Sequence, residues 1–503
     1  MPLRSERSST GREYGRLAPI VLANLVPVVG VSRLGWDPET LVVVYVIEFL
    51  LSLLVAAVTA LFAARPPAGD RDDGVISVTA SPLSEKRGSV RPVSWLPPVY
   101  PRNVPFALAV CGTAVWVAIG VGIVLSQTLD VAEAIRRPGV LASALALFAG
   151  QLVDAGRTYF LRRRYEETSP YAVVETPARQ AVFLTVVGFA LPILGSLGGV
   201  APLVALVFVK MFVEWSAVRS TGGDSGDNGS ENGGTERDGS EGDDEDTAGG
   251  LTDWLAGPDD ATASPDSVSI PDRTPDERVP AHCQAAVAAG VLRTLTVAAP
   301  IYATLTFMAW IALFGLFVGG DASPPVAYGS LVAATALFVG AVAVDVVGYA
   351  LRDGTVEYRR YGDRIVAHDV WLDEPQWDAS LDFVREVDVV HTRLPDRVLG
   401  ARTFEATVGY GDGERERRIG PVPDGTAAVE AFDLPVGGTD LPPIDRRAAA
   451  LAAGVALAAV VGTALWFTGP WSSDADVVRA VFVLPFVAAL TRFLWRQTYV
   501  EPD

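Results

Sequence analysis

The sequence predicts a mainly α, polytopic integral membrane protein with about ten transmembrane helices and one small cytoplasmic domain, a β-barrel plus a helix. Half of the 503 residues are hydrophobic, and the mean hydropathy is +0.31. Several apolar runs exceed the roughly 18 residues that indicate a membrane span. Residues 355–435 instead contain short segments with a period of two, which is typical of strands.

The ten predicted spans follow one another along the whole chain. The first six cover about 17–34, 40–63, 104–126, 139–160, 178–197 and 200–218. Four more cover about 295–318, 325–350, 448–468 and 477–495. A helix of about 23 residues rises ~34 Å, which is enough for a hydrocarbon core of ~30 Å.

Arginine placement predicts the orientation, because cytoplasmic loops carry an excess of basic residues. Basic residues cluster in the N-terminal tail, in loop 64–103, and after the fourth, sixth and eighth spans. Ten spans then leave both termini in the cytoplasm of a protein that spans the cell membrane several times. Arg136 and Arg137 lie in a predicted outer loop and do not fit this pattern.

A strongly acidic segment divides the chain. Residues 220–281 contain 17 acids and three arginines, and too little apolar surface to offset the entropy of ordering them. We expect a disordered cytoplasmic linker there, after a six-helix membrane domain at 1–219. The linker precedes a two-helix membrane unit at 282–352, the cytoplasmic domain at 353–440 and a second two-helix unit at 441–503.

Composition limits the classes of ligand. The net charge is −19, and only two lysines, Lys86 and Lys210, stand beside 38 arginines. An acidic, lysine-poor chain of this kind resembles haloarchaeal proteins. It lacks the basic face that nucleic-acid binding needs. Two cysteines and three scattered histidines predict neither a disulfide framework nor a metal site, and we expect no cofactor.

The first 220 residues carry a set of specific motifs. They are NLVPVVGV with LGWD, YVIEF, LFAGQLVDAGRTYF and VALVFVKMFVEW. In these motifs the N-terminal region resembles an uncharacterised haloarchaeal family of polytopic membrane proteins, a domain of unknown function. That family usually has Trp and Asn where this chain has Val46 and Phe49. The resemblance implies a membrane protein with no established activity.

Ionisable residues within spans are costly and usually have a partner. The intramembrane polar candidates are Glu48, Gln151, Asp154, Lys210 and Glu214. Asp154 has Arg157 three residues on, which predicts a pair on one helix. Glu48 lies deeper, and we expect it to face the bundle interior. Two hypotheses remain open: paired residues that fix helix register, or a proton or ion path.

The segment at 355–435 predicts strands and one helix. TVEYRRYGDRIVAHDV reads as strand, turn, strand, and FVREVDVVHT (Phe383–Thr392) alternates. RTFEATVGYGDGERERRIGPV predicts two more strands, and GTAAVEAFDL (Gly425–Leu434) a short helix. In YRRYGDRIVAHD, DEPQWDASLDFVREVDVV and IGPVPDG the segment resembles bacterial pleckstrin-homology-like domains attached to membrane helices. The resemblance implies a small, partly open barrel that binds lipid headgroups, peptides or neighbouring elements.

The surface candidates of this domain are arginines and tryptophans. Arg359, Arg360 and Arg364 flank the first turn, and Trp371 and Trp377 flank DEP. Ten arginines stand against 17 acids from 355 to 435, so a basic phosphoinositide pocket is not favoured. We expect both tryptophans to cap the barrel; an exposed one would favour a protein contact.

The motifs leave two classes of function open. No HExxH, GxSxG or phosphate-binding glycine loop is present in the sequence, so we expect no enzyme. The first hypothesis is a non-catalytic membrane scaffold or sensor, resident in the lipid bilayer, that presents the cytoplasmic domain to a protein partner. The alternative is a transporter or ion pathway that uses the intramembrane acids.

Overall fold

The computed structural model describes residues 37–66, 82–126, 131–196, 270–306, 324–409, 414–468 and 489–499, with a few single residues between them. The predicted first span, most of the sixth and most of the acidic linker lie outside these ranges. The chain divides into two units, of which the first comprises 1–77, 109–264 and 313–330. The second comprises 78–108, 265–312 and 331–503. This differs from the predicted division, because 78–108 separates from the N-terminal membrane domain.

In the first unit, helix α2 (Pro38–Ala60) packs against several others. Its neighbours are α3 (Val104–Ser126), α4 (Val131–Arg136), α5 (Pro138–Asp154) and α6 (Pro170–Ser196). Tyr45 and Phe49 of α2 share a buried cluster with Val121 of α3. Near the end of α2, Ala57 and Ala60 are almost fully buried, and such small residues allow helices to approach closely in a membrane.

Beyond α5 the helix widens into a π-helical segment, η2 (Ala155–Leu161), followed by a 3₁₀ turn, η3 (Arg164–Glu166). The chain leaving α2 is fixed against this region. The amide of Ala64 donates to the carbonyl of Tyr165 at 2.7 Å, and Phe62 meets Phe160 edge to face at 5.1 Å. The ends of α2 and of the widened helix are therefore joined.

Five helices in the described residues are long and apolar enough to cross a membrane: Thr40–Ala60, Pro101–Gly122, Pro138–Leu161, Cys283–Thr306 and Ala334–Asp353. They correspond to the predicted spans at 40–63, 104–126, 139–160, 295–318 and 325–350. The span predicted at 295–318 begins too late, because the helix already starts at α9 (Cys283–Arg293) and continues through η4 (Thr294–Ala298). The full set of ten is not shown.

In the second unit, α9 packs against α11 (Pro324–Asp353) through a glycine. A Cβ at Gly290 would lie 2.5 Å from the Cβ of Tyr349, so a side chain there would force the two helices apart. Residue 290 must therefore be glycine for the two helices to approach this closely. Small residues at membrane helix contacts generally allow such close approach.

We expect Gly290→Leu to lower the stability of the second unit, because the added side chain overlaps Tyr349 of α11. Overpacking of this kind costs typically ~1–3 kcal/mol. The thermal unfolding of the purified full-length chain in detergent measures the effect. Gly329→Leu on α11 is the control, since a Cβ there meets nothing within 4 Å. Equal melting temperatures for both variants would contradict the prediction.

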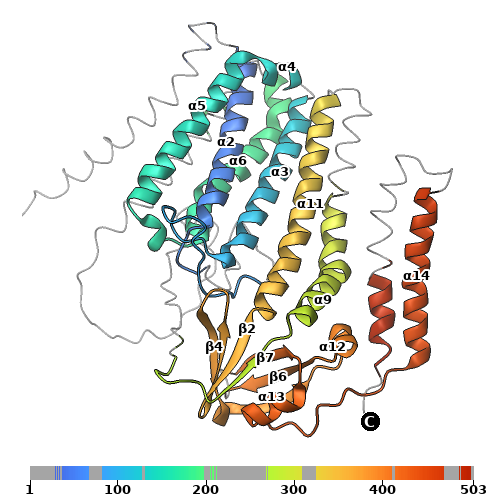
Figure 1. The fold of residues 1–503 in the computed structure, drawn as a ribbon. Helices are drawn as coiled ribbons and strands as arrows, with labels where there is room; N and C mark the ends of the chain where they lie inside the picture. The colour runs from blue at the N-terminus through green and yellow to red at the C-terminus, as the bar shows by residue number, and fades with distance from the viewer. Residues whose placement is uncertain are drawn as a thin grey trace, which may run out of the picture. The chain divides into compact units, whose positions relative to one another are not determined.

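The end of α11 continues directly into the β domain (Figure 1), defined here as residues 356–434 with β1. The first sheet has the order β1-β2-β3-β4, from Glu277–Pro280, Val356–Tyr361, Arg364–Asp369 and Glu374–Ser380. The second sheet has the order β5-β6-β7, from Val384–Val389, Arg402–Val408 and Arg415–Val422. All neighbours are antiparallel.

The predicted strands are confirmed, but the partly open barrel expected from them is not shown. The strands form two separate sheets, because β4 ends at a 3₁₀ turn, η5 (Leu381–Phe383), before β5 starts in the other sheet. The sheets share one core, in which Phe404, Ile365 and Phe432 are buried. Tyr358 of β2 joins them, since its hydroxyl accepts from the amide of Gly420 at 2.9 Å and lies 3.3 Å from the Gly420 carbonyl. Burial raises the pKa of Tyr358, which keeps this hydroxyl protonated.

The predicted helix at Gly425–Leu434 is confirmed as α13 (Gly425–Phe432), capped by Asp424, which accepts from Thr426 and Ala427. Three elements of the β domain were not predicted: β1, β4 and the short helix α12 (Leu394–Leu399). The end of the predicted linker is also corrected. Residues Glu277–Pro280 form β1 and pair with β2, so order begins before residue 281. Helix α14 (Arg446–Thr468) covers the residues of the span predicted at 448–468 but is not among the five candidate membrane helices of the described residues.

Candidate functional site: a buried ion pair and an apolar pocket beside α11

A buried lysine holds loop 82–101 against the β domain. Lys86 forms an ion pair with Asp369 at the end of β3, and the two side chains are 2% and 0% exposed. The Lys86 ammonium also donates to the carbonyl of Leu351 in the last turn of α11 and to Thr355 Oγ1 at 3.3 Å. One side chain therefore joins the loop, the membrane helix and the sheet.

The carboxylate of Asp369 has a partner at each oxygen. Oδ2 accepts from Thr355 Oγ1 at 2.6 Å, and Oδ1 accepts from the amide of Leu372 at 2.7 Å. Such satisfaction matters because taking two charges out of water costs several kcal/mol per ion unless hydrogen bonds and the mutual attraction offset it. Burial lowers the pKa of Lys86, while the hydrogen bond and charge of Asp369 act in the opposite direction.

The backbone of the same loop is also hydrogen-bonded to a side chain of β4. Arg87 donates its amide to Gln376 Oε1 at 2.9 Å and accepts from Gln376 Nε2 at 3.1 Å. Gly88 follows with a φ of +101°, and a Cβ there would lie 3.1 Å from the Cβ of Leu372. Glycine is needed at this point, because the loop turns in a left-handed conformation directly over the β3–β4 turn.

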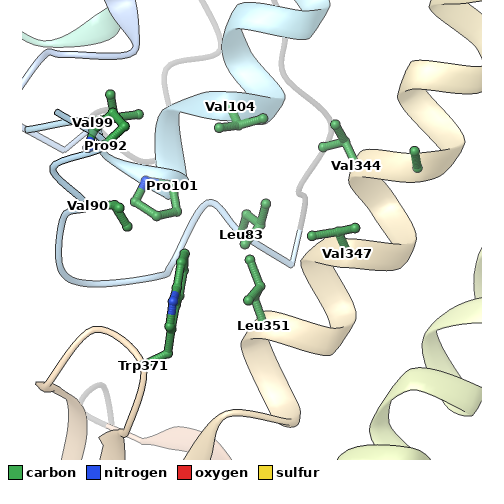
Figure 2. Close-up of a pocket in the computed structure, with 11 residues that line it drawn as sticks. Leu83, Val90, Pro92, Val99, Pro101, Val104, Val344, Val347, Leu351 and Trp371 are labelled. Carbon is green, nitrogen blue, oxygen red and sulfur yellow. The ribbon is translucent and has the colours of Figure 1, made fainter.

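An apolar pocket of about 410 Å³ lies next to the ion pair, and all eleven of its lining residues are apolar. Helix α11 contributes Ala343, Val344, Val347 and Leu351. Loop 82–101 and the first turn of α3 form the opposite wall. Figure 2 shows Trp371 rising from the β3–β4 turn between these walls. The arrangement offers no acid, base or nucleophile in the cavity; it can accommodate an apolar group.

The structure brings together only part of the predicted intramembrane set. Gln151 Nε2 donates to the backbone carbonyl of Glu48 at 3.3 Å, while Glu48 itself is half-buried. Asp154 is exposed on α5 and accepts from Thr158 Oγ1 at 3.0 Å, in place of the predicted pair with Arg157. The widened helix that begins at Ala155 changes the register beyond Asp154. Lys210 and Glu214 lie outside the described residues.

The predicted surface arginines have partners within the β domain. Arg359 pairs with Glu357 at 2.6 Å, and Arg364 with Asp378 at 3.4 Å. Arg360 donates to the carbonyls of Gly362 and Ala431. They do not converge on one anion site. Trp377 packs on the core beside Tyr358, with Arg417 over its ring, whereas Trp371 is 52% exposed.

Arg137, one of the two arginines that do not fit the predicted orientation, has an acidic partner nearby. Arg137 forms an ion pair with Asp37, the acid of the LGWD motif. Its guanidinium also donates to Thr40 Oγ1 at 2.8 Å. An arginine whose charge is neutralised by a neighbouring acid gives weaker evidence about the side of the membrane.

Comparison with known proteins covers the N-terminal region. Residues 6–224 match the model of a family of unknown function (DUF6498). Neither the curated proteins nor the solved structures gave a match. The matched region includes Lys86 and the loop wall of the pocket, whereas Asp369 and α11 lie beyond it. The ion pair thus joins the part that is similar to DUF6498 to the part of the chain that the family model does not cover.

Sequence reasoning missed this site. The available signal was the scarcity of lysine, because a lysine in a chain that otherwise uses arginine points to a position where a compact ammonium is preferred to a planar guanidinium. The residues that contact Lys86 could not be identified from the sequence, because they are distant in the chain. Thr355, for example, is 269 positions from Lys86.

Proposed function

We propose that this protein is a non-catalytic membrane scaffold or sensor that presents its β domain to a cytoplasmic protein partner. The observation that carries the proposal is the buried ion pair of Lys86 and Asp369, with its hydrogen bonds to Leu351 and Thr355. A domain connected to the membrane helices only by a flexible linker would need no such buried ion pair.

Three attachments support a fixed orientation of the β domain on its helices. Helix α11 continues into β2 after residues 354 and 355. Strand β1 pairs with β2 and leads into α9, and the amide of His282 donates to the carbonyl of Pro421 at 2.6 Å. Lys86 holds the loop to the same point. A displacement of the helices is therefore passed to the domain, as a sensor requires, and a partner meets one defined surface.

The finer parts of the proposal rest on sequence. The resemblance of 355–435 to pleckstrin-homology-like domains favours a binding module, although the two sheets do not close into a barrel. Arginine placement favours a cytoplasmic β domain with both termini on the same side. The acidic, lysine-poor composition favours a haloarchaeal source.

Exposed apolar side chains of the β domain provide the positions for a test. Val398 on α12 is 71% exposed, and Phe383 beside β5 is 50% exposed. A photoreactive amino acid at either position, in full-length protein in cells, should give a discrete crosslinked protein. The control carries Phe404→Ala as well, which loosens the core of the domain, and should lose the product. Absence of any crosslink from both positions would contradict the scaffold.

Flux measurements separate the scaffold from the alternative pathway. Proteoliposomes containing the purified chain should show no proton or ion flux above empty vesicles. Flux that Glu48→Leu abolishes, while Ser52→Ala one turn on leaves it intact, would instead establish a pathway through α2 and refute the scaffold.

A further inference from the structure

The apolar pocket lies at the ends of two candidate membrane spans. Its walls come from the last three turns of the candidate span Ala334–Asp353 and from the first residues of the candidate span Pro101–Gly122. Beyond this level the chain forms the β domain. In a bilayer crossed by these two spans, the pocket opens at the boundary between hydrocarbon and headgroups.

The size and lining of the pocket determine what can fill it. A volume of about 410 Å³ is many times the ~30 Å³ that a water molecule occupies. Bound waters need two to four polar partners, and every lining residue is apolar. A small-molecule pocket of this size usually has a few polar groups that fix orientation, and here there are none. A flexible hydrocarbon chain needs no such groups.

The loop that forms one wall carries positive charge in an otherwise acidic protein. Residues 82–103 contain Lys86 and three arginines, Arg87, Arg91 and Arg102, against the single acid Glu85. Lys86 is used in the pair with Asp369. Arg91 stands in the sequence between the lining residues Val90 and Pro92 and is exposed. Arg102 follows the lining residue Pro101 and is half-buried, with its guanidinium 4.9 Å from the centre of the Tyr100 ring. This local charge complements an anionic headgroup beside the apolar cavity.

Two tryptophans mark the same boundary. Trp95 lies at the tip of a short turn closed by the bridge between Val90 and Val99, and it is 77% exposed. Trp371 is 52% exposed, and its indole forms part of the pocket between Pro101 and Leu351 (Figure 2). Tryptophan is enriched at membrane–water interfaces, where its ring is in the headgroup region.

We propose that this pocket holds one acyl chain of a bilayer phospholipid, whose anionic headgroup lies against the basic stretch around Arg91, the exposed arginine of loop 82–101. The lipid then bridges α11, the loop and the β3–β4 turn, next to the ion pair. The lipid occupies this pocket whether or not the β domain recruits a partner.

The test uses a phosphatidylglycerol with a photoreactive diazirine in its acyl chain. The full-length chain is reconstituted in nanodiscs with this probe, irradiated and mapped by mass spectrometry. We expect labels on 83–104 and 343–351. Val347→Trp fills the pocket and should reduce these labels several-fold; Val344→Phe should do so with a smaller added volume. The control is Val339→Trp, because Val339 is 58% exposed on the same helix and does not line the pocket.

The headgroup is tested separately. Arg87→Gln with Arg91→Gln should reduce pocket labelling by the phosphatidylglycerol probe more than labelling by the matching phosphatidylcholine probe. Equal loss with both probes, or none, would overturn the role of the arginines. Pocket labelling that persists in both filled variants, or labels confined to exposed faces of α11 around Val332 and Val339, would show only surrounding bilayer lipid and overturn the site.

Discussion

Lys86→Met is expected to destabilise the second unit by about 3–5 kcal/mol, because removing one partner of a buried ion pair leaves an uncompensated charge. The carboxylate of Asp369 is 0% exposed, and the hydrogen bonds from Thr355 and Leu372 would remain without the ammonium. Unfolding of the purified full-length chain, followed by thermal or denaturant titration in detergent, measures the loss.

Two controls isolate the ion pair from a general effect of the loop. Arg91→Met changes an exposed residue of the same loop and should be nearly neutral. Adding Asp369→Asn to Lys86→Met removes the unpaired charge and should recover part of the stability, since the amide oxygen still accepts from Leu372. Losses that simply add in the double variant would contradict a coupled pair.

Phe404→Ala is expected to cost about 3–5 kcal/mol and to loosen the β domain, since large core aromatics replaced by alanine leave a cavity as well as losing burial. Phe404 is 0% exposed, in the core that both sheets share. Hydrogen exchange of the full-length chain should show protection lost across β5, β6 and β7.

The matched control for this prediction is Phe383→Ala. Phe383 belongs to the same domain but is 50% exposed, so its truncation creates no closed cavity and should leave exchange of the strands nearly unchanged. Equal loss of protection in the two variants would contradict the prediction, because the loss would then not depend on burial in the shared core.

Local sequence patterns predicted the elements whose ends are marked by polar residues or by a turn. Helix α3 (Val104–Ser126) coincides with its predicted span, because the apolar run is bounded by polar residues. Strands β2 and β3 were predicted from the turn between them, where Gly362 has the expected positive φ of 65°. These features are determined by residues that are close in sequence, so they can be recognised without the structure.

Features that depend on distant partners were not predictable in the same way. Strand β1 has four residues in an acidic segment and is a strand only because β2 pairs with it. Strand β4, EPQWDAS, begins with an acid and a proline and shows little alternation. Lys86 gave no sign of its partner. The intramembrane set was grouped by residue type, yet a side-chain contact joins only Gln151 to the backbone of Glu48 among the described members.

The pairing of β1 with β2 also restricts how the chain threads a bilayer. Residues 280 and 357 are opposite one another in the sheet, so they lie on one side of the membrane, and the chain between them crosses an even number of times. The same parity applies between Lys86 and Asp369, which are in direct contact. The predicted spans obey both conditions, with two crossings in the first interval and six in the second. This count is independent of arginine placement, and any revised set of spans must satisfy it.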